Sequence, residues 1–142
     1  MSYTLGDAYT LDYWTDMAKR VEDMGADSVC IKDMAGLLVP QKADELVRAI
    51  KEVIDIPLEL HTHYTSGVAS MTYMKAVEAG ADIIDTAMSP FALGTSQPAT
   101  KLWLRPSKVL RMIPDGSGKT GGDRRLLPPE REEALKSGLM NT

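Results

Sequence analysis

Apolar residues recur at intervals of three and four positions in three stretches of the chain. The stretches cover residues 11–24, 41–53 and 68–79. This spacing puts the apolar side chains on one side of a helix and the polar ones on the other. Thr10 stands before the first stretch as a candidate N-cap, and Gly25 follows it as a stop signal. We therefore predict three amphipathic helices.

Short segments with the character of strands lie between these helices and after the last one. They cover residues 27–32, 58–63 and 82–87, and an extended start at 2–4 makes a fourth candidate strand. The run at 27–32 is nearly continuous, which is typical of a strand buried on both faces. Strands and helices in alternation predict a parallel sheet with right-handed crossovers, and hence the α/β class. The pattern leaves open whether this sheet is half of a (β/α)₈ barrel or a small open sheet.

Length and charge narrow the choice of partners. The chain has 142 residues, whereas a closed (β/α)₈ barrel needs about 250. The net charge of -4 offers no basic surface for nucleic acid or an anionic membrane, and no apolar run approaches the ~20 residues that cross a bilayer. The single cysteine, Cys30, lacks a partner for an internal disulfide, and its apolar neighbours indicate a small buried side chain. We predict a cytoplasmic protein that binds neither nucleic acid nor membrane.

The strongest chemical signal is the pair His61 and His63, at the end of the predicted strand 58–63. Side chains two positions apart point to the same side of a strand, so both imidazoles are able to bind one metal ion. The alternative is one hydrogen-bonded structural histidine beside one exposed histidine. These are the only two histidines in the chain, which favours a shared purpose.

Lys32 ends the predicted strand 27–32, and function in α/β barrels gathers at the carboxyl ends of the strands. In the simplest interpretation Lys32 pairs with Asp33 or extends into solvent. As an ammonium group it repels a metal ion, but a carbamate formed by capture of carbon dioxide is an anionic oxygen ligand. A lysine whose pKa is lowered by desolvation instead forms a Schiff base, as in aldolase-type barrels. The residues alone leave these alternatives open.

Two polar segments follow the ends of predicted strands. Residues 64–67 come directly after the histidines, and residues 94–98 follow the last strand. Their hydroxyls and free backbone N–H groups suit a carboxylate or carbonyl substrate, or serve as ordinary helix caps. Asp85 is a weaker candidate, which alternates with Ala87 along its strand and could thus face the interior of a barrel. The candidates for substrate binding are Thr65, Gly94, Thr95 and Gln97.

Four segments carry a resemblance to a known family. They are Cys-Ile-Lys-Asp-Met-Ala-Gly-Leu-Leu (30–38), Leu-His-Thr-His-Tyr-Thr-Ser-Gly (60–67), Asp-Ile-Ile-Asp-Thr-Ala (82–87) and Gly-Thr-Ser-Gln-Pro-Ala (94–99). In this order and spacing they resemble the carboxyltransferase domain of oxaloacetate decarboxylase alpha subunits, pyruvate carboxylase and transcarboxylase. The resemblance covers residues 2–100.

The resemblance implies a fold and a chemistry. Residues 1–100 are expected to be half of a TIM barrel, strands five to eight with their helices. Lys32 is expected to be the carbamylated catalytic residue, and Lys32, His61 and His63 to hold one divalent metal ion, zinc first of all. In the family the ion polarises a keto acid such as pyruvate while carboxyl passes to or from biotin on a separate carrier protein or domain. Full-length members are expected to form oligomers.

Parts of the family's pattern do not occur in this chain. The resemblance places one further metal ligand, an aspartate, in an Arg-Asp-Ala-His-Gln type motif on the first strand, together with a substrate-binding arginine on the first half of the barrel. Neither that motif nor a Met-Lys-Met biotin site occurs here. We therefore expect the chain to be inactive alone, to bind zinc weakly, and to begin at a point that is not the ancestral start.

The C-terminal part has a different character. Residues 101–131 lose the resemblance and residues 132–142 regain it. This pattern predicts compensating reading-frame errors, because shifted codons for the start of 101–131 are able to encode family-like sequence such as Thr-Leu-Val-Ala-Ala-Phe-Lys. The alternative is a divergent polar extension. We expect an irregular tail over residues 101–142.

Other functions stay open beside the carboxyltransferase. Another metal-dependent barrel lyase, or a Claisen-type synthase, shares the His-x-His pair but has no need of Lys32. A Schiff-base aldolase leaves His61 and His63 without a shared task, and a carbamate-bridged hydrolase carries its His-x-His before its lysine, the reverse of the order here. From a different class, the polypeptide is an inactive truncated translation product.

Overall fold

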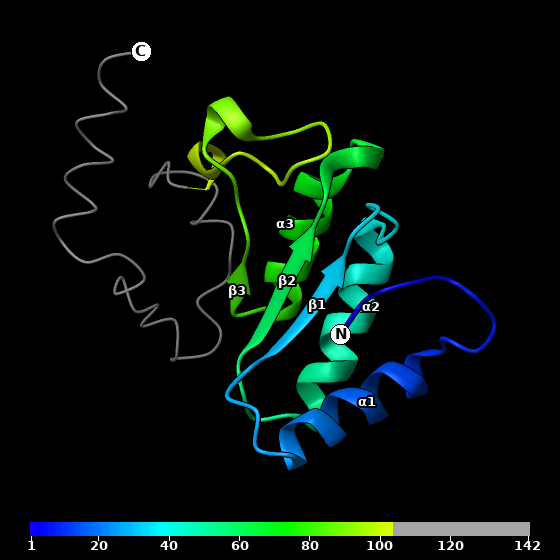
Figure 1. The fold of residues 1–142 in the computed structure, drawn as a ribbon. Helices are drawn as coiled ribbons and strands as arrows, with labels where there is room; N and C mark the ends of the chain where they lie inside the picture. The colour runs from blue at the N-terminus through cyan, green and yellow to red at the C-terminus, as the bar shows by residue number, and fades with distance from the viewer. Residues whose placement is uncertain (104–142) are drawn as a thin grey trace, which may run out of the picture.

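The computed structural model describes residues 1–103 of the chain. Helices and strands alternate along it from Leu11 onward (Figure 1). The predicted tail lies outside the described residues beyond residue 103, and with it most of the segment 101–131. The elements are α1 (Leu11–Asp23), β1 (Val29–Asp33), α2 (Pro40–Val53), β2 (Leu58–Thr62), η1 (Tyr64–Ser66), α3 (Ala69–Ala79), β3 (Ile83–Ile84), η2 (Ser89–Phe91) and η3 (Thr100–Leu102).

The three α-helices begin and end within one residue of their predicted bounds. The hydroxyl oxygen of Thr10 accepts a hydrogen bond from the Tyr13 backbone N–H at 3.2 Å and so caps α1. Pro40 opens α2, where its missing N–H costs no hydrogen bond. Gly80 ends α3 with a φ of 110°, a left-handed conformation that glycine adopts without strain. None of these described helices has both the length and the apolar character needed to cross a membrane.

The described strands form one parallel sheet in the order β1-β2-β3. The register pairs Lys32 of β1 with His61 of β2, and Leu60 of β2 with Ile84 of β3. The predicted first strand at residues 2–4 is reduced to a single bridge between Ser2 and Lys32. The structure thus confirms the α/β class with a parallel sheet, but it shows three strands where the pattern predicted four.

β3 is shorter than predicted for a local reason. Its last ladder bond runs from the Asp85 N–H to the Leu60 carbonyl at 3.1 Å. The next ladder bond would join the Thr62 N–H to the Asp85 carbonyl, but the hydroxyl of Tyr73 stands between these two groups. The strand therefore ends at Ile84 instead of residue 87.

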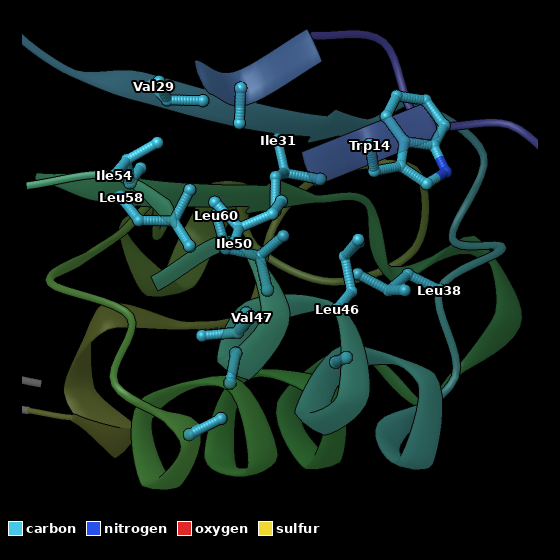
Figure 2. Packing of buried hydrophobic residues seen from close by; sticks show 14 of the residues in the cluster. Trp14, Val29, Ile31, Leu38, Leu46, Val47, Ile50, Ile54, Leu58 and Leu60 are labelled. Atoms are coloured by element: carbon cyan, nitrogen blue, oxygen red, sulfur yellow. The ribbon is translucent and has the colours of Figure 1, made fainter. Parts of the chain in front are cut away.

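The two sides of the sheet differ in burial. Val29 and Ile31 of β1, with Leu58 and Leu60 of β2, face the helices and are at most 1% exposed. Figure 2 shows them packed over the side chains of α2. The core also takes in Trp14, Ala18, Leu38, Ala43, Leu46, Val47, Ile50, Ile54, Tyr73, Ala76 and Ala79.

The opposite side of β1 is open among the described residues. Cys30 is half-buried there and Lys32 is exposed, so burial alternates along the strand. The prediction that the run at 27–32 is buried on both faces is therefore wrong for this part of the chain. The helices supply an apolar partner to one face of the strand, and the site described next lies on the other.

Candidate metal-binding site

The candidate site lies at the carboxyl ends of β1 and β2. The sheet register places Lys32 beside His61, and His63 follows β2 directly. His61 and His63 are both half-buried. The structure thus brings the three residues expected to hold a metal ion to the same end of the sheet, where the strands β1 and β2 finish.

The two imidazoles face each other through their Nε2 atoms. These atoms are 3.2 Å apart, and the ring planes are inclined by 56°. Two nitrogen ligands at about 2.0–2.1 Å from one tetrahedral zinc ion lie about 3.3–3.4 Å from each other. The separation of the Nε2 atoms therefore fits coordination of a single ion.

The partners of the Nδ1 atoms decide which ring nitrogen carries the proton. His61 Nδ1 lies 2.6 Å from Asp85 Oδ2, and His63 Nδ1 lies 2.6 Å from the carbonyl oxygen of Thr95. A carbonyl or carboxylate oxygen accepts, so each Nδ1 donates and each neutral ring keeps a lone pair on Nε2. Two lone pairs facing each other repel unless a cation or a donor lies between them. Metal-binding histidines show this arrangement, with the second ring nitrogen bound to a carboxylate or carbonyl.

Gln97 closes the space in front of the two histidines. Its Nε2 lies 3.3 Å from His61 Nε2 and 3.4 Å from His63 Nε2. The amide N–H groups here satisfy the two lone pairs and so stand in for the positive charge of a cation. Backbone bonds hold this loop on the site, since the Tyr64 N–H donates to the Ser96 carbonyl at 2.7 Å.

The four predicted substrate-binding residues take different places. Thr95 and Gln97 reach the histidines, Thr95 through its carbonyl and not its hydroxyl. Gly94 is exposed and adopts a φ of 59° in the turn that carries them. Thr65 is exposed on η1, and no hydrogen bond between described residues links it to the histidines.

Asp33 ties the ends of β1 and β2 together. Its buried carboxylate accepts hydrogen bonds from the backbone N–H groups of Leu37 and Leu38, at 2.9 and 2.8 Å. It also accepts one from the Thr62 hydroxyl at 2.9 Å, and its carbonyl accepts one from the His63 N–H at 3.1 Å. The carboxylate is thus engaged by these donors, and the simple pairing with Lys32 does not form.

Gly36 permits the loop after β1 to approach the site closely. Its φ is 67°, and a Cβ added there would lie 2.8 Å from the carbonyl oxygen of His63 and 3.0 Å from Ser66 Oγ. Only glycine avoids both the left-handed strain and this contact. The turn that carries His63 is therefore shaped by a residue from the neighbouring βα unit.

Pattern reasoning missed two residues near the histidines and underrated a third. Asp85 was only a weak candidate, while Tyr73 and Glu59 were not named. Glu59 shares its side of β2 with His61, and burial together with the Asp85 carboxylate raises the pKa of Glu59. The sequence did carry a signal for Glu59: it stands two positions before His61, and residues two apart lie on the same side of a strand. Burial also raises the pKa of the Cys30 thiol, which disfavours the reactive thiolate form.

The ligand set is incomplete within the described part of the chain. Among residues 1–103 no group of three or more histidine, cysteine, aspartate or glutamate side chains has a metal-binding arrangement. Zinc usually takes four ligands, three of them from the protein in a catalytic site. His61 and His63 fit such an ion, and Lys32 becomes a third ligand only if it is carbamylated.

The sequence of this chain is similar to those of known proteins. Residues 6–94 match the family model described as HMGL-like. The chain is 46% identical over 134 residues to a pyruvate carboxylase subunit from Methanocaldococcus jannaschii, a match that covers 94% of this chain and 23% of that protein. It is 62% identical over 91 residues to pyruvate carboxylase of Bacillus subtilis, covering 64% of this chain and 8% of that one.

A solved structure adds the same relationship in three dimensions. The carboxyl transferase domain of Rhizobium etli pyruvate carboxylase with pyruvate and biocytin superimposes with a TM-score of 0.70 at 38% identity. That match covers 82% of this chain and 20% of the solved chain. The chain therefore spans less than a quarter of each of these relatives.

Proposed function

Because the chain belongs to the HMGL-like family, we propose that it is the metal-binding part of a carboxyltransferase of the pyruvate carboxylase type. The complete enzyme would move a carboxyl group between oxaloacetate or pyruvate and biotin held on a carrier. Two named relatives are pyruvate carboxylases, and the solved carboxyl transferase domain was obtained with pyruvate and biocytin, which supports the proposal. Within the barrel we assign residues 1–100 to strands five to eight.

The observation that carries this proposal is the facing pair of imidazoles. The two Nε2 atoms are 3.2 Å apart, and both Nδ1 atoms are occupied by oxygen acceptors. In the proposal His61 and His63 hold a divalent ion, and imidazole suits zinc well. The Lys32 carbamate would be the third ligand from this chain, and the pairing of Lys32 with His61 in the sheet register supports this assignment. When bound, the ion supplies the Lewis acidity that polarises the carbonyl of a keto acid.

The surrounding residues bind and orient in this proposal. Asp85 and the Thr95 carbonyl keep the ring protons on Nδ1, so that both Nε2 lone pairs stay available. Gln97 carries the amide nearest the two histidines, and its N–H donors suit a carboxylate or carbonyl oxygen of the substrate. Thr65, Gly94 and the Thr95 hydroxyl remain weaker candidates at the same end of the sheet.

The partners belong to the same proposal. A biotin carrier, as a domain or as a separate protein, delivers the carboxyl group, the substrate is a small keto acid, and further copies of the enzyme form an oligomer. We place the activity in the cytoplasm, which the single cysteine supports because a lone Cys30 forms no internal disulfide.

The test uses a hybrid barrel, in which residues 1–103 of this chain replace the matching segment of the M. jannaschii protein. We expect the hybrid barrel to retain one divalent ion per chain and to decarboxylate oxaloacetate when biotin is supplied. His63→Ala should lose both properties, because a single imidazole remains. Lys75→Ala, at an exposed ion pair on α3, is the control that should keep both. A folded hybrid barrel that holds no metal and turns over no oxaloacetate contradicts the proposal.

The chain tested alone gives a second result. Its described residues supply His61, His63 and Lys32 toward the metal, fewer ligands than a zinc site in the complete barrel would have, so we expect weak zinc binding and no turnover of oxaloacetate. Equilibrium dialysis and an oxaloacetate assay measure these two properties. Metal-dependent decarboxylation by the chain alone would show that the first half of the barrel is not required.

A further inference from the structure

β2 and β3 separate where they approach the candidate metal site. The ladder stops after the bond from the Asp85 N–H to the Leu60 carbonyl. The Tyr73 hydroxyl then accepts a hydrogen bond from the Thr62 N–H at 3.0 Å and donates one to the Asp85 carbonyl at 2.6 Å. One side chain from α3 therefore replaces a direct bond between the two strands.

Burial and packing hold the Tyr73 side chain in this position. It is fully buried, and its ring also packs edge-on against Trp103 with centroids 6.1 Å apart. Burial raises the pKa of the phenol well above its usual range, so the hydroxyl keeps the proton that it donates. Both backbone groups that lost their ladder partner are satisfied by this one hydroxyl, which makes its removal costly.

The separation of the strands has a consequence for Asp85. With a hydroxyl inserted between them, the two backbones stand farther apart than the roughly 4.7–4.9 Å of a regular sheet. The Asp85 carboxylate extends across this wider gap, and its Oδ2 lies 2.6 Å from His61 Nδ1. His63, by contrast, is oriented by the backbone carbonyl of Thr95, on a loop that does not involve Tyr73.

We propose that Asp85 is a positioning residue, held by Tyr73 through its backbone carbonyl, which fixes the tautomer of His61. Asp85 keeps the proton on Nδ1 and directs Nε2 at the point that His63 also faces. A carboxylate behind an imidazole also makes that ring a stronger metal donor, which a backbone carbonyl does to a smaller extent. This inference rests on the metal site of the proposed function for its purpose, but the tautomer is measurable without metal.

The first measurement is the tautomer of each ring in the metal-free 142-residue chain. The chain is labelled with ¹⁵N-histidine and purified without a polyhistidine tag, so only His61 and His63 give signals. Long-range ¹H–¹⁵N spectra should show the proton on Nδ1 in both rings. A mixture of tautomers in both rings, as in free histidine, would overturn the proposal.

Two variants separate positioning from general stability. Asp85→Asn should change His61 to a mixture of tautomers and leave His63 unchanged, because an amide is able to donate to Nδ1 as well as accept from it. Tyr73→Phe should act in the same direction to a smaller extent, since the carboxylate remains. Asp7→Asn, on an exposed loop, is the charge-matched control. If His61 keeps its proton on Nδ1 in Asp85→Asn, or if both rings change together, the inference is wrong.

Zinc titration of the same samples distinguishes this inference from the proposed function. Zinc binding, followed through the Nε2 shifts, should weaken by about 10–100-fold in Asp85→Asn. Fixed tautomers without any zinc binding in the unaltered chain would leave the positioning role intact and contradict the weak zinc binding expected of His61 and His63, while the metal site of the complete enzyme is tested in the hybrid barrel. Equal zinc affinity in the chain and in Asp85→Asn would refute the role of Asp85 toward the metal and leave the metal site intact.

Discussion

The two sides of the sheet are built from the same strands, but one side forms the core and the other carries the candidate site. On the helix side Ile31 and Leu60 are fully buried, and each such side chain stabilises the fold by about 1.5–3 kcal/mol. On the other side Lys32 is exposed and His61 is half-buried, with polar partners in place of apolar ones. Successive residues of a strand point to opposite sides, so a single position along the chain separates the core from the candidate site.

This contrast indicates that the stability of the fold and the binding of metal depend on different residues. Substitutions on the helix side should lower the free energy of unfolding and leave the affinity for metal unchanged. Substitutions on the other side should weaken metal binding and leave the free energy of unfolding nearly unchanged. Residues at the ends of the strands, where loops from both sides meet, should affect both quantities.

The largest effect is expected at Lys32. In the hybrid barrel Lys32→Ala should lose the metal and the activity, and small carboxylates should partly restore them by occupying the position of the carbamate. Lys32→Arg should not be restored, because the guanidinium group stays positive. Metal content and oxaloacetate decarboxylation measure both. Reduction with borohydride in the presence of pyruvate is the opposing test, since a covalent adduct on Lys32 would establish a Schiff base in place of the carbamate.

The next effect concerns Ile31, one position away on the other side of β1. Ile31→Ala should lower the free energy of unfolding of the hybrid barrel by about 2–5 kcal/mol, because it leaves a cavity under the helices. Urea unfolding gives the loss, and the folded variant should keep its metal. Cys30→Ala, on the opposite side of β1, removes a single sulfur atom and should cost less. Loss of metal by a folded Ile31→Ala protein would show that the two sides are not independent.

Substitution of Gly36 should have a smaller effect on stability and should also weaken metal binding. Gly36→Ala forces a left-handed residue and a Cβ at 2.8 Å from the His63 carbonyl, at a cost of about 1–3 kcal/mol. The displaced turn should also weaken metal binding. Gly25→Ala is the matched control, since Gly25 has a φ of 88° but no atom within 4 Å of an added Cβ. Zinc affinity that is equal in the two variants would contradict the role of Gly36 in placing His63.

The smallest effect is expected for the exposed ion pair between Lys42 and Glu45 on α2. Its atoms are 2.7 Å apart, but both side chains are more than half exposed. Glu45→Gln should leave the free energy of unfolding almost unchanged, because water and salt screen an exposed pair, and it should leave metal binding intact. Urea unfolding at low and high salt would reveal a larger contribution if one exists.

Local pattern predicted the helices well because caps and stops lie close in sequence to what they control. Thr10 and Gly80 are examples, and no distant residue is needed to explain them. The end of β3 was not predictable in this way, since it depends on Tyr73 from another element. Burial on both faces of β1 was predicted wrongly, because an apolar run does not reveal which neighbours cover each face.

The candidate site was predictable in part. The spacing of His61 and His63 indicated two imidazoles on one side of a strand, and the structure places their Nε2 atoms together. The partners of those rings were not predictable, because Asp85 lies 24 residues from His61 and Thr95 lies 32 residues from His63. Carbamylation of Lys32 and the reading-frame errors in residues 101–131 stay predictions.

X-ray absorption at the zinc edge of the hybrid barrel tests the central claim most directly, namely that His61 and His63 hold one ion on the open side of the sheet. The spectrum should show two imidazole nitrogens at about 2.0–2.1 Å with oxygen atoms as the other ligands. His61→Ala should remove one imidazole from the spectrum or abolish zinc binding. A sulfur ligand, or a spectrum that His61→Ala and His63→Ala both leave unchanged, would contradict the account.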